Sequence, residues 1–143
     1  MFVGEYNHTI DTKGRVIVPS KFREELGSEF VVTKGLDNCL FVFPMDEWNR
    51  FEAKLQSLPV ANKNARKFSR FFLSGASMTE ADKQGRILLP PTLREFAGME
   101  KEIVLVGVGS RVEIWSKENW IANSTYDDMD EIAENMADLG LGI

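Results

Sequence analysis

The side chains best suited to chemistry in this chain belong to a short pattern, Asp-x-x-Gly-Arg, that occurs twice. It reads DTKGR at residues 11–15 and DKQGR at residues 82–86. Asp at the start and Gly at the end are typical of a tight turn, in which Gly supplies a positive φ. An Arg on the tip of a two-stranded ribbon can enter a DNA major groove and donate two hydrogen bonds to guanine or to phosphate. Two interpretations are open: a turn in which Asp pairs with Arg, or a nucleic-acid contact.

Both patterns belong to a longer internal repeat. Residues 11–27 (DTKGRVIVPSKFREELG) and 82–98 (DKQGRILLPPTLREFAG) match without a gap at an offset of 71. The identical pairs are Asp11/Asp82, Gly14/Gly85, Arg15/Arg86, Pro19/Pro90, Arg23/Arg94, Glu24/Glu95 and Gly27/Gly98. The similarity continues more loosely from residues 30–48 to residues 103–120, where Trp48 matches Trp120. Agreement of this extent indicates a tandem duplication of one structural unit.

Each copy predicts the same order of elements, which begins with a β-hairpin that carries the Asp-x-x-Gly-Arg turn. In the first copy a short strand at 8–10 pairs with a strand at 15–18, and Pro19 then starts a short helix. The first copy continues with a helix at 20–26, strands at 30–33 and 39–43, and a helix at 46–55. The second copy gives a short helix near 91–97, strands at 103–108 and 111–115, and a helix from about 117. Residues 61–73 contain neither Gly nor Pro and are expected to form a helical linker.

Neither copy has enough apolar residues to close a core of its own. We therefore expect two halves that complete each other in a pseudo-twofold domain of mixed α and β type. Cys39 is expected to be a small core residue and His8 a strand residue. Phe68, Phe71 and Phe72 are expected to belong to the core because they share one side of a helical pattern.

The charge of the chain is unevenly distributed. The 143 residues carry a formal net charge of −5, which by itself argues against a nucleic-acid partner. Residues 1–112 hold 16 basic and 14 acidic side chains, a net charge of +2, whereas residues 113–143 carry −7. The acidity therefore lies in a C-terminal extension. A net charge of +2 produces only a weak electrostatic field, so a single chain is expected to bind DNA poorly. Binding is expected to depend instead on where the arginines are placed and on several copies acting together.

Several classes of function are excluded or disfavoured. One Cys and one His cannot form an intrachain disulfide or a Cys/His zinc site. The first residues lack the pattern of a signal peptide, and no apolar run reaches membrane-spanning length. We therefore expect no signal peptide and a soluble, cytoplasmic protein. There is no phosphate-binding loop or nucleophile elbow, and the Gly107-x-Gly109 pair lacks the third Gly of a dinucleotide fingerprint and is expected to be a hairpin turn. We expect no cofactor, no metal, no small-molecule ligand and no enzyme activity.

The sequence closely resembles the MraZ family of bacterial regulators found at the head of the division and cell-wall gene cluster. The segments that carry the resemblance are residues 4–27, 69–77, 82–95 and 110–120, and it covers essentially the whole chain. It implies an α+β fold of two tandem SpoVT/AbrB-like modules, whose interlocked hairpins form a swapped-hairpin, double-split β-barrel with peripheral helices. The expected division is a first module at 5–47, a helical linker at 48–75, a second module at 76–119 and an acidic C-terminal helix at 120–143.

The resemblance also implies a function. The family comprises transcription factors, usually repressors, that assemble into rings and bind short G-rich direct repeats upstream of their own operon at the nucleoid. The family's D-x-x-x-R motif corresponds to Asp11/Arg15 and Asp82/Arg86. We expect Arg15 and Arg86 to contact DNA, with Lys13 and Lys83 on phosphates. Asp11 and Asp82, with Gly14 and Gly85, are expected to orient the turns. The second copy has Gln84 in place of Lys13 and Pro91 in place of Ser20, so the two hairpins are expected to differ in strength.

Two further features support other interpretations. Lys63, Arg66, Lys67 and Arg70 share one helical face, which could meet phosphates but fits an exposed or interface face better. The acidic C-terminus favours a rival hypothesis, a ring-forming structural or adaptor protein that binds a protein partner through this segment.

Overall fold

The computed structural model describes residues 1–143 and contains two antiparallel sheets, one of six strands and one of two. The larger sheet has the order β1-β7-β8-β4-β3-β5, and the smaller is a ribbon of β2 and β6. The strands are β1 (Phe2–Thr9), β2 (Arg15–Ile17), β3 (Phe30–Lys34), β4 (Leu40–Pro44), β5 (Ser77–Thr79), β6 (Arg86–Leu88), β7 (Glu102–Gly109) and β8 (Val112–Ser116). The larger sheet is shared between the repeats: β7 and β8 of the second repeat lie between β1 and β4 of the first, and β5 of the second pairs with β3 of the first. Neither repeat therefore forms a sheet of its own.

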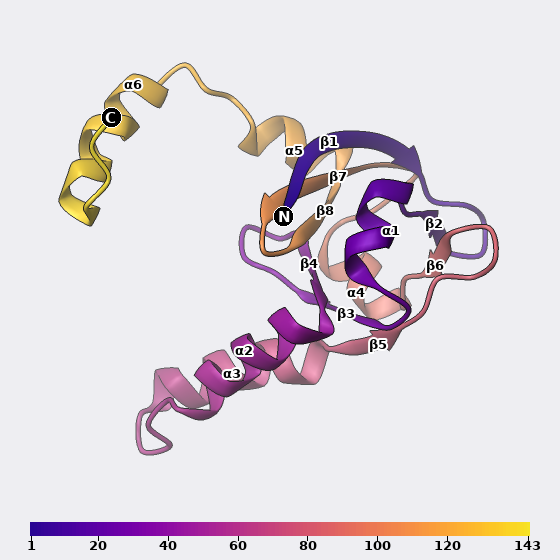
Figure 1. Ribbon diagram of the computed structural model, residues 1–143, viewed down its shortest axis with the longest axis horizontal. Helices are drawn as coiled ribbons and strands as arrows, with labels where there is room; N and C mark the ends of the chain where they lie inside the picture. Colours follow the sequence, from indigo (N-terminus) through magenta and orange to yellow (C-terminus); the bar gives the residue numbers. More distant parts are fainter.

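Six helices connect or follow these strands. They are α1 (Ser20–Leu26), α2 (Met45–Gln56), α3 (Lys63–Gly75), α4 (Pro91–Phe96), α5 (Lys117–Asn123) and α6 (Met129–Met136), followed by a 3-10 turn η1 (Ala137–Leu139). The helices α2 and α3 form a hairpin that extends away from the sheets, and α6 stands apart from the rest of the chain (Figure 1). The prediction of helices at 46–55 and 61–73 is confirmed. None of the helices combines the length and the apolar character needed to cross a membrane.

The first expected hairpin is wrong in its strand pairing. The strand expected at 8–10 is the end of β1, which runs beside β7 of the second repeat over its whole length. A single bridge between Ile10 and Val16 links it to β2, whose ladder partner is β6. β2 and β6 have three residues each and bury one central side chain each, so they are stabilised by pairing and sharing a core. The sequence did not indicate this pairing, because the alternation of apolar residues specifies a face but not a partner.

The main hydrophobic core is built jointly by the two repeats, as predicted from their small apolar content. Val16, Val18 and Phe22 of the first copy pack in one cluster with Ile87, Leu89 and other residues of the second. The pairs Val16/Ile87 and Val18/Leu89 are equivalent in the repeat, and all four side chains are at most 2% exposed. This symmetry supports the prediction of a pseudo-twofold α+β domain.

A second core lies between the α2–α3 hairpin and the sheet, and it corrects one expectation. Phe72 is 1% exposed and packs against Phe41 and Phe51. Phe71 is half-buried and packs against the edge of this core, whereas Phe68 is 43% exposed. The expectation that all three phenylalanines belong to the core is therefore wrong for Phe68. Because α3 packs through one narrow face only, Phe68 covers the outer side of Phe72 and remains in contact with solvent.

Gly107 and Gly109 were expected to form a hairpin turn. Both belong to the end of β7 in the β7–β8 hairpin, and the turn itself follows at Ser110 and Arg111. Gly107 lies so close to the backbone of Phe2 and Val3 that a Cβ atom would overlap them. The close approach of β1 therefore accounts for this glycine.

Cys39 gives a direct test of the packing. Its side chain is fully buried, its thiol donates to the carbonyl of Leu36 at 3.2 Å, and burial raises its pKa well above the ordinary range. Because the thiolate is the reactive form, alkylation in the native protein should be at least about a hundredfold slower than in denaturant. Mass spectrometry of iodoacetamide-treated protein measures both rates. Equal rates in the two conditions would contradict this packing.

Candidate nucleic-acid interface

The ribbon of β2 and β6 presents two arginines on one exposed face. Its register places Arg15 opposite Leu88, Val16 opposite Ile87 and Ile17 opposite Arg86. Because side chains alternate along a strand, the buried pair Val16 and Ile87 points into the core. The outer face then consists of four side chains: Arg15, Ile17, Arg86 and Leu88.

Each arginine is held by the aspartate that begins its turn. In the first copy, Oδ1 of Asp11 accepts hydrogen bonds from the backbone N–H groups of Lys13 and Arg15, both at 2.9 Å. Oδ2 accepts from Nε of Arg15 at 2.8 Å, which completes an ion pair. Gly14 has a φ of 83° and its N–H donates to the carbonyl of Asp11, so the turn requires the conformation that glycine adopts most readily.

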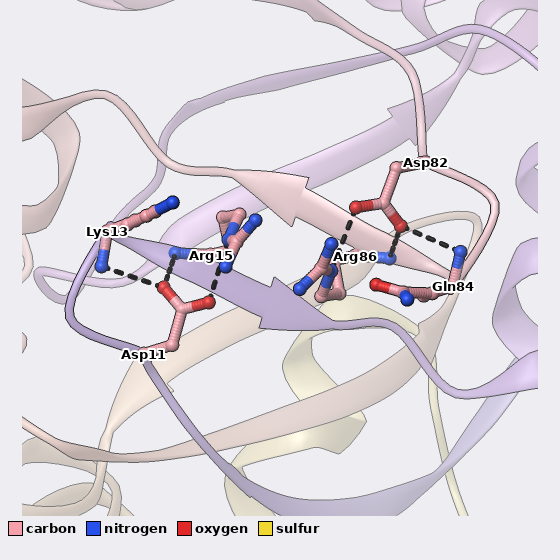
Figure 2. A network of polar contacts seen from close by, with 6 residues as sticks. All are labelled: Asp11, Lys13, Arg15, Asp82, Gln84 and Arg86. Carbon is pink, nitrogen blue, oxygen red and sulfur yellow. Dashed lines mark hydrogen bonds and ion pairs between the residues drawn. The ribbon is translucent and has the colours of Figure 1, made fainter.

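The second copy repeats this geometry (Figure 2). Oδ1 of Asp82 accepts from the backbone N–H groups of Gln84 and Arg86 at 2.9 Å, and Oδ2 accepts from Nε of Arg86 at 2.8 Å. The two ion pairs lie toward opposite ends of the ribbon, with both guanidinium groups between the two carboxylates. The difference between the copies is thus confined to side chains at the tips, because Lys13 is replaced by Gln84 while the backbone bond to the aspartate is kept.

The electrostatics of the two aspartates follow from these contacts. The backbone N–H of Arg15 is the largest cause that lowers the pKa of Asp11 below its ordinary value of 3.8, and the guanidinium and the N–H of Lys13 add to it against a partial opposing effect of desolvation. The N–H of Arg86 does the same for the pKa of Asp82. Both carboxylates are therefore ionised at neutral pH and hold their arginines by charge-assisted hydrogen bonds.

The aspartates use only one side of each guanidinium group. Nε donates to the carboxylate, whereas Nη1 and Nη2 of Arg15 and Arg86 make no hydrogen bond within the chain. The two arginine side chains are 30% and 28% exposed. Each guanidinium group is thus oriented by its Nε and keeps its two terminal NH2 groups for an outside acceptor. A guanine edge, with O6 and N7, or a phosphate accepts such a pair of donors.

Each turn is supported by the other repeat, a feature that the sequence reasoning missed. The N–H of Val18 donates to the carbonyl of Gly85 at 2.9 Å, and the N–H of Leu89 donates to the carbonyl of Gly14 at 3.0 Å. Arg94 lies over Gly14, where a Cβ atom would be 2.8 Å from its Cζ, and Arg23 lies over Gly85 in the same way at 2.7 Å. The identity of Arg23 with Arg94 in the repeat was the available signal, but it gave no indication that each packs on the opposite turn.

The remaining basic residues singled out in the sequence are all exposed. Lys13 and Lys83 lie in the two turns, at positions that are not equivalent in the repeat, since Lys83 matches Thr12. The basic face of α3 is on the helical hairpin that extends away from the ribbon (Figure 1). The structure therefore brings the two Asp-x-x-Gly-Arg patterns together and leaves the α3 cluster outside this surface.

Known proteins match this chain in sequence along its whole length. The family model for the MraZ protein, described as antitoxin-like, matches residues 1–71 and again residues 72–139. A protein of Lachnoclostridium phytofermentans named transcriptional regulator MraZ is 61% identical over 141 residues, which cover 99% of both chains. Proteins with the same name from Clostridium acetobutylicum and from a Thermoanaerobacter species are 57% and 59% identical over 99% of this chain and all of their own length. The match of both halves to the family model, together with this identity over the full length, shows that the chain belongs to the MraZ family.

Proposed function

We propose that this chain is a sequence-specific DNA-binding transcriptional regulator and that the outer face of the β2–β6 ribbon contacts the major groove. The observation that carries the proposal is the pair of arginines held through Nε by Asp11 and Asp82, with both terminal nitrogens free. Fixing the guanidinium before binding reduces the entropy that must be lost on forming a bidentate contact. The names of the full-length relatives agree with this function.

The charge balance of the ribbon explains why several copies of the chain would be needed for tight DNA binding. Each arginine charge is balanced by its own aspartate, so the excess positive charge of the ribbon comes from Lys13 and Lys83. These lysines would contact phosphates, and two such contacts give weak, salt-sensitive binding. Several ribbons in a ring-like homo-oligomer would raise the effective concentration of each on short direct repeats.

Guanine is the base whose two major-groove acceptors match an arginine, so G-rich repeats are the targets that this face would select. Bound to such repeats in the promoter of its own division and cell-wall cluster, the oligomer would repress transcription by occluding the promoter. A DNA partner would also keep the protein at the nucleoid in the cytoplasm.

The rival function, an adaptor that binds a protein through the acidic C-terminus, has one observation in its favour. Residues of α6 and η1 are mostly exposed, and this segment stands apart from the ribbon (Figure 1). A chain that ends at residue 125 separates the two functions, because it retains the ribbon. Repression and DNA binding that persist in this shortened chain would count against the adaptor, and their loss with an intact ribbon would favour it.

Replacing the arginines tests the proposed function. Arg15→Ala and Arg86→Ala should each weaken binding to the DNA upstream of the chain's own operon by roughly tenfold to a hundredfold, because each removes one bidentate contact worth about 1–3 kcal/mol. Fluorescence anisotropy at one fixed salt concentration measures the change. Arg70→Ala, on the exposed face of α3, is the matched control and should bind like the wild type. Unchanged affinity in both ribbon variants would overturn the assigned role.

The lowered pKa values of Asp11 and Asp82 lead to a prediction about how thermal stability depends on pH. Because the folded-state pKa of each is lowered, their contribution is fully present above about 3.8 and is lost as the pH falls through the lower folded-state value. The double variant Asp11→Asn/Asp82→Asn should therefore melt below the wild type at pH 7, and the difference should narrow at pH 3. Thermal unfolding followed by circular dichroism measures it, with Asp127→Asn/Asp128→Asn in the C-terminal segment as control. A gap of equal size at both pH values would rule out this contribution.

A further inference from the structure

The outer face of the ribbon carries two exposed aliphatic side chains for which the proposed arginine contacts give no role. Ile17 is 47% exposed and Leu88 is 58% exposed, whereas their strand neighbours Val16 and Ile87 are buried. A solvent-facing position on a strand is normally polar. Ile17 and Leu88 occupy equivalent positions in the two repeats, so each copy offers one arginine and one aliphatic group on this face.

Register places each aliphatic group beside an arginine. Leu88 lies directly opposite Arg15, and Ile17 lies directly opposite Arg86. Opposite Cβ atoms in an antiparallel pair are about 5 Å apart, and alternate residues of one strand are about 6.7 Å apart. The second distance is about twice the 3.4 Å that separates successive bases of a DNA strand. An arginine bound to a guanine would therefore bring an aliphatic side chain to within one or two base pairs of it.

The major groove has one apolar feature, the C5-methyl group of thymine. Cytosine lacks the methyl group and presents an N4 donor that an aliphatic side chain cannot satisfy. The neighbouring guanidinium groups have terminal nitrogens that donate to nothing within the chain. Base edges and phosphates supply acceptors for these donors and an apolar protein surface does not, which favours a nucleic acid as the occupant of this face.

We propose that Ile17 and Leu88 form a thymine-methyl subsite, so that the ribbon selects thymine rather than cytosine within one or two base pairs of each contacted guanine. This inference rests on the proposed DNA-binding function and specifies the sequence that it recognises. The arginines would specify the guanines of the DNA site, and the two aliphatic side chains would specify the adjoining thymines.

Thymine-to-uracil substitution tests the subsite, since uracil differs from thymine only in lacking the methyl group. The probe is the duplex that full-length protein selects as its tightest binder from a randomised pool, with each thymine replaced in turn by deoxyuridine. Uracil at a contacted position should weaken wild-type binding by about threefold to fivefold, as expected for one buried methyl group. Ile17→Ala and Leu88→Ala should each lose this discrimination at one set of positions and bind both duplexes alike.

Val60→Ala is the matched control, because Val60 is 78% exposed and lies in the turn between α2 and α3. It should keep the full preference for thymine. Failure to select any duplex would overturn the proposed function itself. Arginine-dependent binding with no effect of uracil at any position would overturn the subsite alone. Light scattering distinguishes a further outcome. If Ile17→Ala or Leu88→Ala changes the oligomeric state while uracil has no effect, another copy of the chain covers this face and the subsite is likewise overturned.

Discussion

Pairing between β2 and β6 is the contact on which the rest of this structure depends. Each strand has three residues and buries a single central side chain, which is too little for a stable hairpin. When they pair, Val16 and Ile87 enter one core, and a backbone carbonyl of each turn accepts a hydrogen bond from an N–H of the other repeat. The duplication thus produces one interlocked unit from two halves that share one core.

The same pairing determines the chemistry of the outer face. The period of two that directs the core residues inward must direct Arg15 and Arg86 outward, on one side of the ribbon. The aspartates then hold the arginines at the cost of neutralising their charge. Such a surface favours geometric fit over long-range attraction, in agreement with a chain whose net charge is negative. Under the proposed function, several ribbons in an oligomer would add to the affinity of one.

Local features of the fold were predictable, and the partners of the strands were not. The Asp–Arg pair and the helices at residues 46–55 and 61–73 follow from turn composition and helical spacing, which involve residues close in sequence. The pairing of β2 with β6 did not follow from the residue pattern, because alternation specifies a face but not a partner. The interlocked hairpins implied by the family resemblance agree with it. The contacts of Arg23 and Arg94 with the opposite turns depend on that exchange, so they were missed for the same reason. The exposure of Phe68 depends on how far α3 extends beyond the sheet, which periodicity does not encode.

The central claim is that an interlocked ribbon presents two fixed arginines to DNA, and a crystal structure of the protein bound to its selected duplex tests it most directly. The account predicts that Nη1 and Nη2 of Arg15 and Arg86 lie about 2.7–3.2 Å from guanine O6 and N7, with both Asp–Arg ion pairs retained. A complex in which DNA lies along the basic face of α3, with the ribbon left free, would contradict it.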